Sequence, residues 1–235
     1  MAGATGELFI GGGDAVPGGR GGDSGSHASG ARRDETLAPG ARLLRGFALD
    51  HVDALLDGLA EVVAAAPLRH LDTPGGFTMS VAMTNCGELG WVSDRRGYRY
   101  DRIDPASGLP WPAIPAGFRH LATTAAEAAG HARFEPDACL VNRYAPGARL
   151  SLHEDADECD FSQPIVSVSL GIPAVFLFGG ARRTDKALRV PLCHGDVVVW
   201  GGPARRRFHG VRPVKAGSHP RLGAWRLNLT FRKAG

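Results

Sequence analysis

Two residues in the middle of the chain place an imidazole beside a carboxylate. His153 and Asp155 are separated by one residue within residues 150–157. Residues i and i+2 of a β-strand point to the same face, so a strand here would present both side chains together. A His and a carboxylate, completed by a second His from a distant strand, form the set of ligands that holds non-haem Fe(II). A third ligand is therefore needed elsewhere in the chain.

Histidines further along the chain are the candidates for this third ligand. His209 ends a predicted strand and is followed by Gly210, so its side chain can point inward from the strand end. His194 precedes a predicted turn, and His219 precedes Pro220 in a predicted loop. We therefore predict that His209 completes the metal site and that His194 serves turn geometry.

The last predicted strand alternates polar and apolar residues. In a closed barrel its polar face would point inward, and buried arginines are costly unless anions pair with them. A dicarboxylate would supply such anions through charge-assisted, bidentate pairs. A second polar pair at i and i+2 lies on an earlier strand and can donate further hydrogen bonds. The polar residues of the two strands are Arg226, Asn228, Thr230 and Arg232, and Asn142 and Tyr144.

The second half of the chain reads as short strands separated by Gly and Pro turns. This pattern is typical of a jelly roll, or double-stranded β-helix. We expect a mainly β protein with flanking helices, at residues 50–65, capped by Asp50, and at 115–129, ended by Gly130. The predicted strands are residues 138–144, 150–153, 165–170, 174–178, 188–192, 196–200, 207–211 and 225–232.

Three regions divide the chain. Residues 1–38 are rich in Gly and Ser, and we expect a flexible tail because such a composition buries little apolar surface. Residues 39–135 are expected to form an N-terminal extension with a substrate-binding lid, in which Trp91 and Tyr98 lie among arginines. Aromatic side chains beside arginines suit base stacking next to phosphate contacts. Residues 136–235 are expected to form the double-stranded β-helix.

Composition limits the class of protein. The chain has 235 residues, 43% of them hydrophobic, with a net charge of +3. Its basic residues gather in the last quarter, as in the run 205–207, which suits either a polyanionic partner or a solvated surface. The four cysteines are isolated from one another, which argues against a disulfide framework or a zinc knuckle. With no membrane-length apolar run and no secretory signal, we expect a cytoplasmic protein.

Five stretches carry a resemblance to a known family. They are residues 73–87 (TPGGFTMSVAMTNCG), 136–147, 150–155, 194–202 and 228–232. With these stretches the chain resembles the AlkB family, the Fe(II)- and 2-oxoglutarate-dependent dioxygenases that repair alkylated nucleic acid, and most closely its bacterial type. The resemblance runs from about residue 39 to the C-terminus. The Gly-rich tail lies outside it.

The resemblance implies roles for the residues already singled out. It makes His153, Asp155 and His209 the Fe(II) ligands, with O2 as a further co-substrate. The side chains implied to bind 2-oxoglutarate are Arg226 and Arg232, aided by Asn142, Tyr144 and Asn228.

It also implies a substrate site. Trp91 is expected to stack on the damaged base with His153 on the other face, and Asp157 to read the exocyclic amine with Glu158 beside it. The other side chains expected at the substrate are Thr73 and Tyr98 on its backbone, Met83 in the pocket, and Arg183 on a loop.

The implied reaction is oxidative demethylation of bases such as 1-methyladenine and 3-methylcytosine. The expected substrate is DNA, single-stranded in preference, with RNA left open, and the expected protein is a monomer that binds no membrane. A dioxygenase acting on a small molecule or a protein would share the ligands but would not need the lid at residues 73–100. A noncatalytic nucleic-acid-binding module would tolerate loss of a ligand. Phe77, Glu154 and Ala156 depart from the family pattern without touching the implied iron or 2-oxoglutarate ligands.

Overall fold

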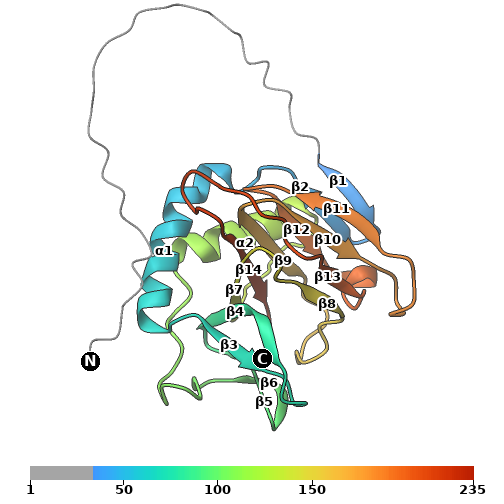
Figure 1. The fold of residues 1–235 in the computed structure, drawn as a ribbon. Coiled ribbons are helices and arrows are strands. Elements are labelled where there is room, and N and C mark those ends of the chain that lie inside the picture. Colours follow the sequence, from blue (N-terminus) through green and yellow to red (C-terminus); the bar gives the residue numbers. More distant parts are fainter. Residues whose placement is uncertain (1–33) are drawn as a thin grey trace, which may run out of the picture. The chain divides into compact units, whose positions relative to one another are not determined.

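The structure is a computed structural model that describes residues 34–235. Two β-sheets face each other, and two helices cover the outer face of the larger sheet (Figure 1). This is the predicted mainly β, jelly-roll architecture with flanking helices. Within the predicted tail, residues 1–33 lie outside the described part of the chain. Residues 35–38 form a strand, because they pair with the strand that follows.

The larger sheet has eight strands, and its centre is buried on both faces. Every residue of β9 and β14 is buried, since helices cover one face and the second sheet covers the other. In spatial order the strands are β1 (Glu35–Ala38), β2 (Ala41–Leu44), β12 (Val197–Trp200), β9 (Ile165–Gly171), β14 (Arg226–Arg232), β7 (Ala138–Tyr144), β4 (Thr78–Gly87) and β3 (Arg69–Asp72).

The smaller sheet has four strands and carries the two histidines of interest. Its spatial order is β11 (Leu188–Leu192), β10 (Ala174–Phe178), β13 (His209–Val211) and β8 (Leu150–His153). Strands β7, β8, β10 and β11 begin and end at the predicted residues. Strand β13 begins two residues later than predicted, so that His209 is its first residue.

The two helices pack against the larger sheet through one apolar side each. Helix α1 (Val52–Ala65) and helix α2 (Ala116–Ala128) bury Leu55, Leu59, Phe118 and Leu121 in one apolar core together with residues of strands β9 and β14. The predicted Asp50 cap is wrong. Residues Leu49–His51 form a 3-10 turn, so Asp50 lies inside that turn and His51 takes the capping position without a side-chain bond. Gly130 follows α2 with a φ of 93°, as predicted for a glycine that ends a helix.

A short hairpin extends the structure below the larger sheet in Figure 1. It consists of β5 (Gly90–Asp94) and β6 (Gly97–Asp101), and it is joined to β4 by hydrogen bonds between Asn85 and the backbone of Trp91. The hairpin carries Trp91 and Tyr98 from the predicted lid. Among residues 34–235, no helix is long and apolar enough to cross a membrane.

Candidate metal and co-substrate site

The two histidines face each other across neighbouring strands. His153 ends β8 and His209 begins β13, and the antiparallel register pairs them directly. Their ring centroids are 4.4 Å apart. A separation of 56 residues in the sequence is thus closed by one strand pairing, which brings the predicted third ligand to the first.

Both imidazoles are oriented in the same way by the backbone. The Nδ1 of His153 lies 2.8 Å from the carbonyl oxygen of Ser151, and the Nδ1 of His209 lies 3.0 Å from that of Arg207. A carbonyl can only accept, so each Nδ1 carries the proton and donates it. The lone pair of each Nε2 is then available to a metal ion, in the arrangement common to metal-binding histidines.

Asp155 reaches the histidines from outside the strand. We predicted that His153 and Asp155 share one face of a strand, but β8 ends at His153 and Asp155 lies in the irregular segment that follows. Its Oδ1 lies 3.7 Å from Nε2 of His153, and its Oδ2 lies 3.8 Å from Nε2 of His209. Tertiary contacts therefore hold this carboxylate in place, where strand geometry was expected to do so.

The surroundings of the site keep Asp155 and His209 in the forms that bind metals. Burial opposes ionisation of Asp155, but Arg232 and the two histidines outweigh it and hold the pKa of Asp155 well below its usual value. Burial, together with the neighbouring His153, lowers the pKa of His209 to about 4, so its ring is neutral at neutral pH. One carboxylate oxygen and two imidazole nitrogens lie within 4.8 Å of one another. Such a set suits Fe(II) with open coordination positions.

A buried arginine marks the other end of the same cavity. Arg226 is 2% exposed and forms no ion pair with any carboxylate in residues 34–235. It donates hydrogen bonds to Ser169 and to the Leu227 carbonyl, and its Nε has no partner. Burial lowers the pKa of Arg226, and the neighbouring Tyr144, over whose ring the guanidinium lies, offsets this effect only in part. An unpaired cation of this kind needs an anion from outside the protein.

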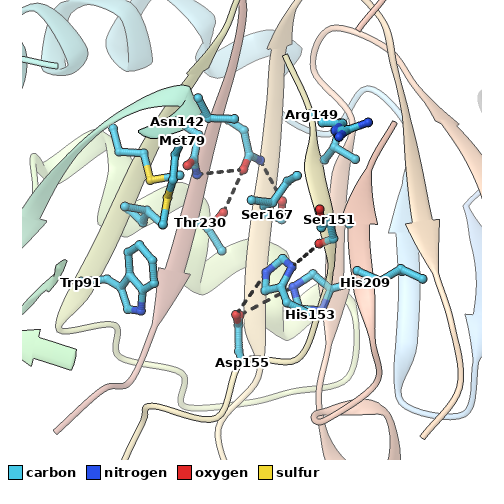
Figure 2. Close-up of a pocket in the computed structure, with 18 of the residues that line it drawn as sticks. Met79, Trp91, Asn142, Arg149, Ser151, His153, Asp155, Ser167, His209 and Thr230 are labelled. Atoms are coloured by element: carbon cyan, nitrogen blue, oxygen red, sulfur yellow. Dashed lines mark hydrogen bonds and ion pairs between the residues drawn. The ribbon is translucent and has the colours of Figure 1, made fainter. Parts of the chain in front are cut away.

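Polar side chains, among them Asn142, Ser167 and Thr230, line the same cavity as the two histidines (Figure 2). Asn228 donates to Ser167 and accepts from Thr230, and Asn142 donates to Asn228. The Oδ1 of Asn142 has no partner, so the network retains an unsatisfied acceptor. Strands β14 and β7 pair Arg226 with Tyr144 and Asn228 with Asn142, which places the predicted polar residues on one inner face.

Arg232 lies at the metal end of this polar face. Its Nη2 lies 2.6 Å from Oδ2 of Asp155, and its Nε donates to the same oxygen at 2.8 Å. Arg226 and Arg232 are six residues apart on one strand, or about 20 Å between Cα atoms at roughly 3.3 Å per residue. A short dicarboxylate between these two long side chains could pair with one guanidinium at each end.

The cavity has a volume of about 790 Å³, and the lid forms one of its walls. Trp91 projects into it across from His153 (Figure 2). The ring of Trp91 stacks on Tyr98 at a centroid distance of 5.5 Å, and its Nε1 donates to Asp157 at 2.8 Å. The predicted base-stacking and amine-reading residues are therefore in direct contact with each other.

The remaining predicted substrate residues also line this cavity. Thr73, Met83, Glu158 and Arg183 all contribute to its walls. Glu158 differs from Asp157, because its carboxylate is buried and already bonded within the protein. Phe77, one of the departures from the family pattern, is 77% exposed at the lid.

Known proteins with similar sequences and structures show which family the chain belongs to. Residues 40–232 match the family described as the 2OG-Fe(II) oxygenase superfamily. The chain is 59% identical to the alpha-ketoglutarate-dependent dioxygenase AlkB of Salmonella typhimurium over 200 residues, which cover 85% of this chain and 93% of that protein. The chain belongs to the AlkB family. It is also 57% identical to AlkB of Escherichia coli over 86% of this chain and 93% of that protein. The solved structure of OsALKBH1 covers 86% of the chain and is itself covered completely, with a TM-score of 0.75 and 33% identity.

Membership in the AlkB family makes the chain an Fe(II)- and 2-oxoglutarate-dependent dioxygenase. The donor set fits these cofactors. One carboxylate and two imidazoles suit Fe(II), and Arg226, which has no carboxylate partner among residues 34–235, suits a carboxylate of 2-oxoglutarate.

Sequence reasoning missed residues that support the ligands. Arg205 appeared to be one cation of a basic run, but its side chain is 2% exposed and it contacts Glu158. The run at residues 205–207 suited a polyanionic partner or a solvated surface, and no local pattern distinguishes the buried arginine from its neighbours. Ser167 and Ser169 on β9 were also missed, because a serine in an apolar strand carries no signal until its neighbours are known.

Proposed function

We propose that the chain removes N-linked methyl groups from alkylated nucleobases, such as 1-methyladenine and 3-methylcytosine in DNA, with RNA as a further substrate. The observation that carries the proposal is the wall of the cavity opposite the metal ligands. There an aromatic ring and a carboxylate, Trp91 and Asp157, face the same space as His153. A cationic methylated base matches such a pocket, since it can stack on the indole and pair with the acid.

Metal and co-substrate have separate places in this proposal. His153, Asp155 and His209 would hold Fe(II), while Arg226 and Arg232 would bind the carboxylates of 2-oxoglutarate. Bound Fe(II), with O2 and 2-oxoglutarate, supplies the oxidation that converts the N-methyl group to N-hydroxymethyl and 2-oxoglutarate to succinate and CO2. The hydroxymethyl group then leaves as formaldehyde and the base is restored.

The residues around the co-substrate would set its orientation. Asn142, Tyr144 and Asn228 surround the Arg226 end of the cavity, where the unsatisfied Oδ1 of Asn142 and the Nε of Arg226 await partners. A carboxylate that accepts a hydrogen bond from the Nε of Arg226 is favoured, because a buried polar atom without a partner costs about 1–3 kcal/mol. The Oδ1 of Asn142 is itself an acceptor and needs a donor, which 2-oxoglutarate does not carry.

The lid would hold the nucleotide. A base must leave its stack to enter a cavity of this kind, and single-stranded or damaged sites require the least unstacking. Thr73, Met83 and Tyr98 line the cavity together with Arg183, which can contact phosphate. Phosphate contacts of this kind weaken as salt concentration rises.

We further propose that the protein acts as a cytoplasmic monomer. Its four cysteines are all unpaired, as is usual in a reducing compartment. Gel filtration of the purified chain and localisation of a tagged copy in cells would test the two parts of this proposal separately.

One assay tests the catalytic proposal. The protein is incubated with Fe(II), 2-oxoglutarate and a single-stranded oligonucleotide that carries 1-methyladenine, and formaldehyde and repaired base are followed. We expect turnover that needs all three components. A folded, iron-loaded protein that consumes 2-oxoglutarate but releases no formaldehyde from this oligonucleotide, or from its 3-methylcytosine counterpart, would refute the substrate assignment.

A further inference from the structure

A buried ion pair lies behind the metal and co-substrate ligands. It joins Arg205 and Glu158, whose side chains are each 2% exposed, with Nη2 of Arg205 at 3.2 Å from Oε2 of Glu158. Arg205 follows the short 3-10 helix η2 (Gly202–Ala204) and precedes His209 by four residues. Glu158 follows Asp155 by three residues. The pair therefore connects the two chain segments that carry ligands from different strands.

Arg205 holds the segment after β8 at several points. Its Nε donates to the carbonyl of Gln163 at 3.0 Å, and its Nη1 donates to the carbonyl of Asp155 at 3.3 Å. The guanidinium also lies over the ring of Phe161, with its carbon 5.3 Å from the centroid. Because Asp155 lies beyond the end of β8, these bonds replace the strand pairing that would otherwise fix its backbone.

Glu158 connects the same pair to the lid and to Arg232. Its Oε1 accepts a hydrogen bond from the hydroxyl of Tyr100 on β6 at 2.8 Å. The same oxygen lies 3.2 Å from Nε of Arg232. Arg232 is thus shared between Asp155 and Glu158.

The charges of this group balance only if Arg205 is included. Arg205 and Arg232 are positive, and Asp155 and Glu158 are negative, so the four side chains sum to zero. Without Arg205 the sum becomes −1, so the site is one unit more negative whether or not the metal ion is bound, and Arg232 alone must serve both buried carboxylates. An excess negative charge in a buried site repels an incoming anion strongly, because the effective dielectric constant there is low.

We propose that Arg205 is a positioning residue that neutralises Glu158, and so keeps Arg232 available to a carboxylate of 2-oxoglutarate while holding the backbone of Asp155. This proposal rests on the proposed role of Arg232 in co-substrate binding. It assigns Glu158 to the support of the lid and of Arg232, and leaves recognition of the base amine to Asp157.

The test is a double-mutant cycle with the full chain. The variants are Arg205→Met, Glu158→Gln and the two combined. Two quantities are measured: the KM for 2-oxoglutarate, and the rise in melting temperature that 2-oxoglutarate produces in the Mn(II)-loaded protein, which requires no turnover. The control is Arg45→Met, which breaks another ion pair of a buried acid, Asp196, away from the cavity.

The two single variants are expected to affect the KM for 2-oxoglutarate differently. Arg205→Met should raise the KM for 2-oxoglutarate at least about tenfold, the lower end of what the loss of a supporting partner costs at a metal site. Glu158→Gln should leave this KM unchanged or lower it, and the double variant should return most of the way to the wild type. Arg45→Met should lower the melting temperature without changing the KM.

Other results would overturn the proposal. If Arg205→Met leaves the 2-oxoglutarate dependence unchanged, or if the double variant is as impaired as Arg205→Met, charge compensation is not the role of Arg205. If Arg205→Met does not fold, the KM for 2-oxoglutarate of Glu158→Gln is compared with that of the double variant, because both lack the buried acid. Under charge compensation the two values should be similar, and a much higher KM in the double variant would overturn the proposal. The melting measurement does not depend on the nucleic-acid substrate, so failure of the demethylation assay leaves this test intact.

Discussion

Replacement of Arg226 by methionine should stabilise the ligand-free protein and weaken 2-oxoglutarate binding at the same time. Methionine has a similar length and no charge. In the free protein Arg226 is a buried cation with no carboxylate partner, and burial lowers its pKa. Replacing buried charge by an apolar side chain ranges from neutral to about 1–4 kcal/mol stabilising in related cases. We expect a gain near the lower end, about 1 kcal/mol, because the bonds to Ser169 and Leu227 are lost.

The loss of affinity can be estimated from the hydrogen bonds that Arg226 would make. Hydrogen bonds to charged groups contribute about 1.5–3 kcal/mol each, so a bidentate pair with a carboxylate gives at least about 3 kcal/mol. This corresponds to roughly a 100-fold weaker Kd. At a 2-oxoglutarate concentration 100 times the wild-type Kd, the ligand stabilises the wild type by about 2.7 kcal/mol and the variant by only about 0.4 kcal/mol.

Thermal unfolding of the Mn(II)-loaded protein, with and without 2-oxoglutarate, measures both effects. A change of 1 kcal/mol shifts the melting temperature of a protein of this size by about 2–4 °C. The control is Arg143→Met on the same strand pair. Arg143 also has a buried Nε without a partner, but it lies over Trp225 and does not line the cavity. Equal stabilisation of Arg226→Met and the wild type by 2-oxoglutarate would refute the reasoning, whereas Arg143→Met should behave like the wild type.

Three further predictions concern the metal, the base and the lid. His153→Ala should abolish Mn(II) binding, measured by electron paramagnetic resonance, and formaldehyde release, because it removes one of three ligands; retained binding would contradict the assignment. Trp91→Leu should raise the KM for the methylated oligonucleotide about 10–100-fold, since base stacking on an aromatic ring contributes about 1–3 kcal/mol, and should leave the KM for 2-oxoglutarate unchanged. Arg99 and Arg96 lower the pKa of Asp94 from 3.8 to about 2, so the folded form binds fewer protons than the unfolded form. The stabilisation that this carboxylate gives to the β5–β6 hairpin should be complete above pH 3.8 and should be lost as the pH falls through 2. The NMR signals of the Arg99 guanidinium report this loss. If those signals disappear already at pH 5, the prediction is contradicted.

Most of the fold could be predicted because its strands are short, apolar and separated by Gly and Pro turns. Strand β7, for example, has the predicted bounds, since its residues alternate between the two buried faces of one sheet. The predicted cap at Asp50 failed for a local reason. A 3-10 turn and an α-helix both begin with the same backbone φ and ψ region, so the sequence does not decide where one becomes the other.

The types of residue in the site were evident in the sequence, since metal ligation and carboxylate binding need particular side chains. His153, Asp155, His209 and the alternating arginines of β14 could be selected by type and spacing, and strand alternation placed Asn228 on the same face as Arg226. The resemblance to the AlkB family added the implied roles of Trp91 and Asp157.

The tertiary structure decided what depends on contacts between distant segments. Register alone sets His209 opposite His153, and packing alone buries Arg205 against Glu158 while leaving its neighbour Arg206 exposed. The strand that was expected to present Asp155 ends at His153. Instead, Arg205 holds the backbone carbonyl of Asp155 and Arg232 holds its carboxylate. Local sequence fixes the chemistry of each side chain, whereas its burial, charge balance and partners follow from residues far away in the chain.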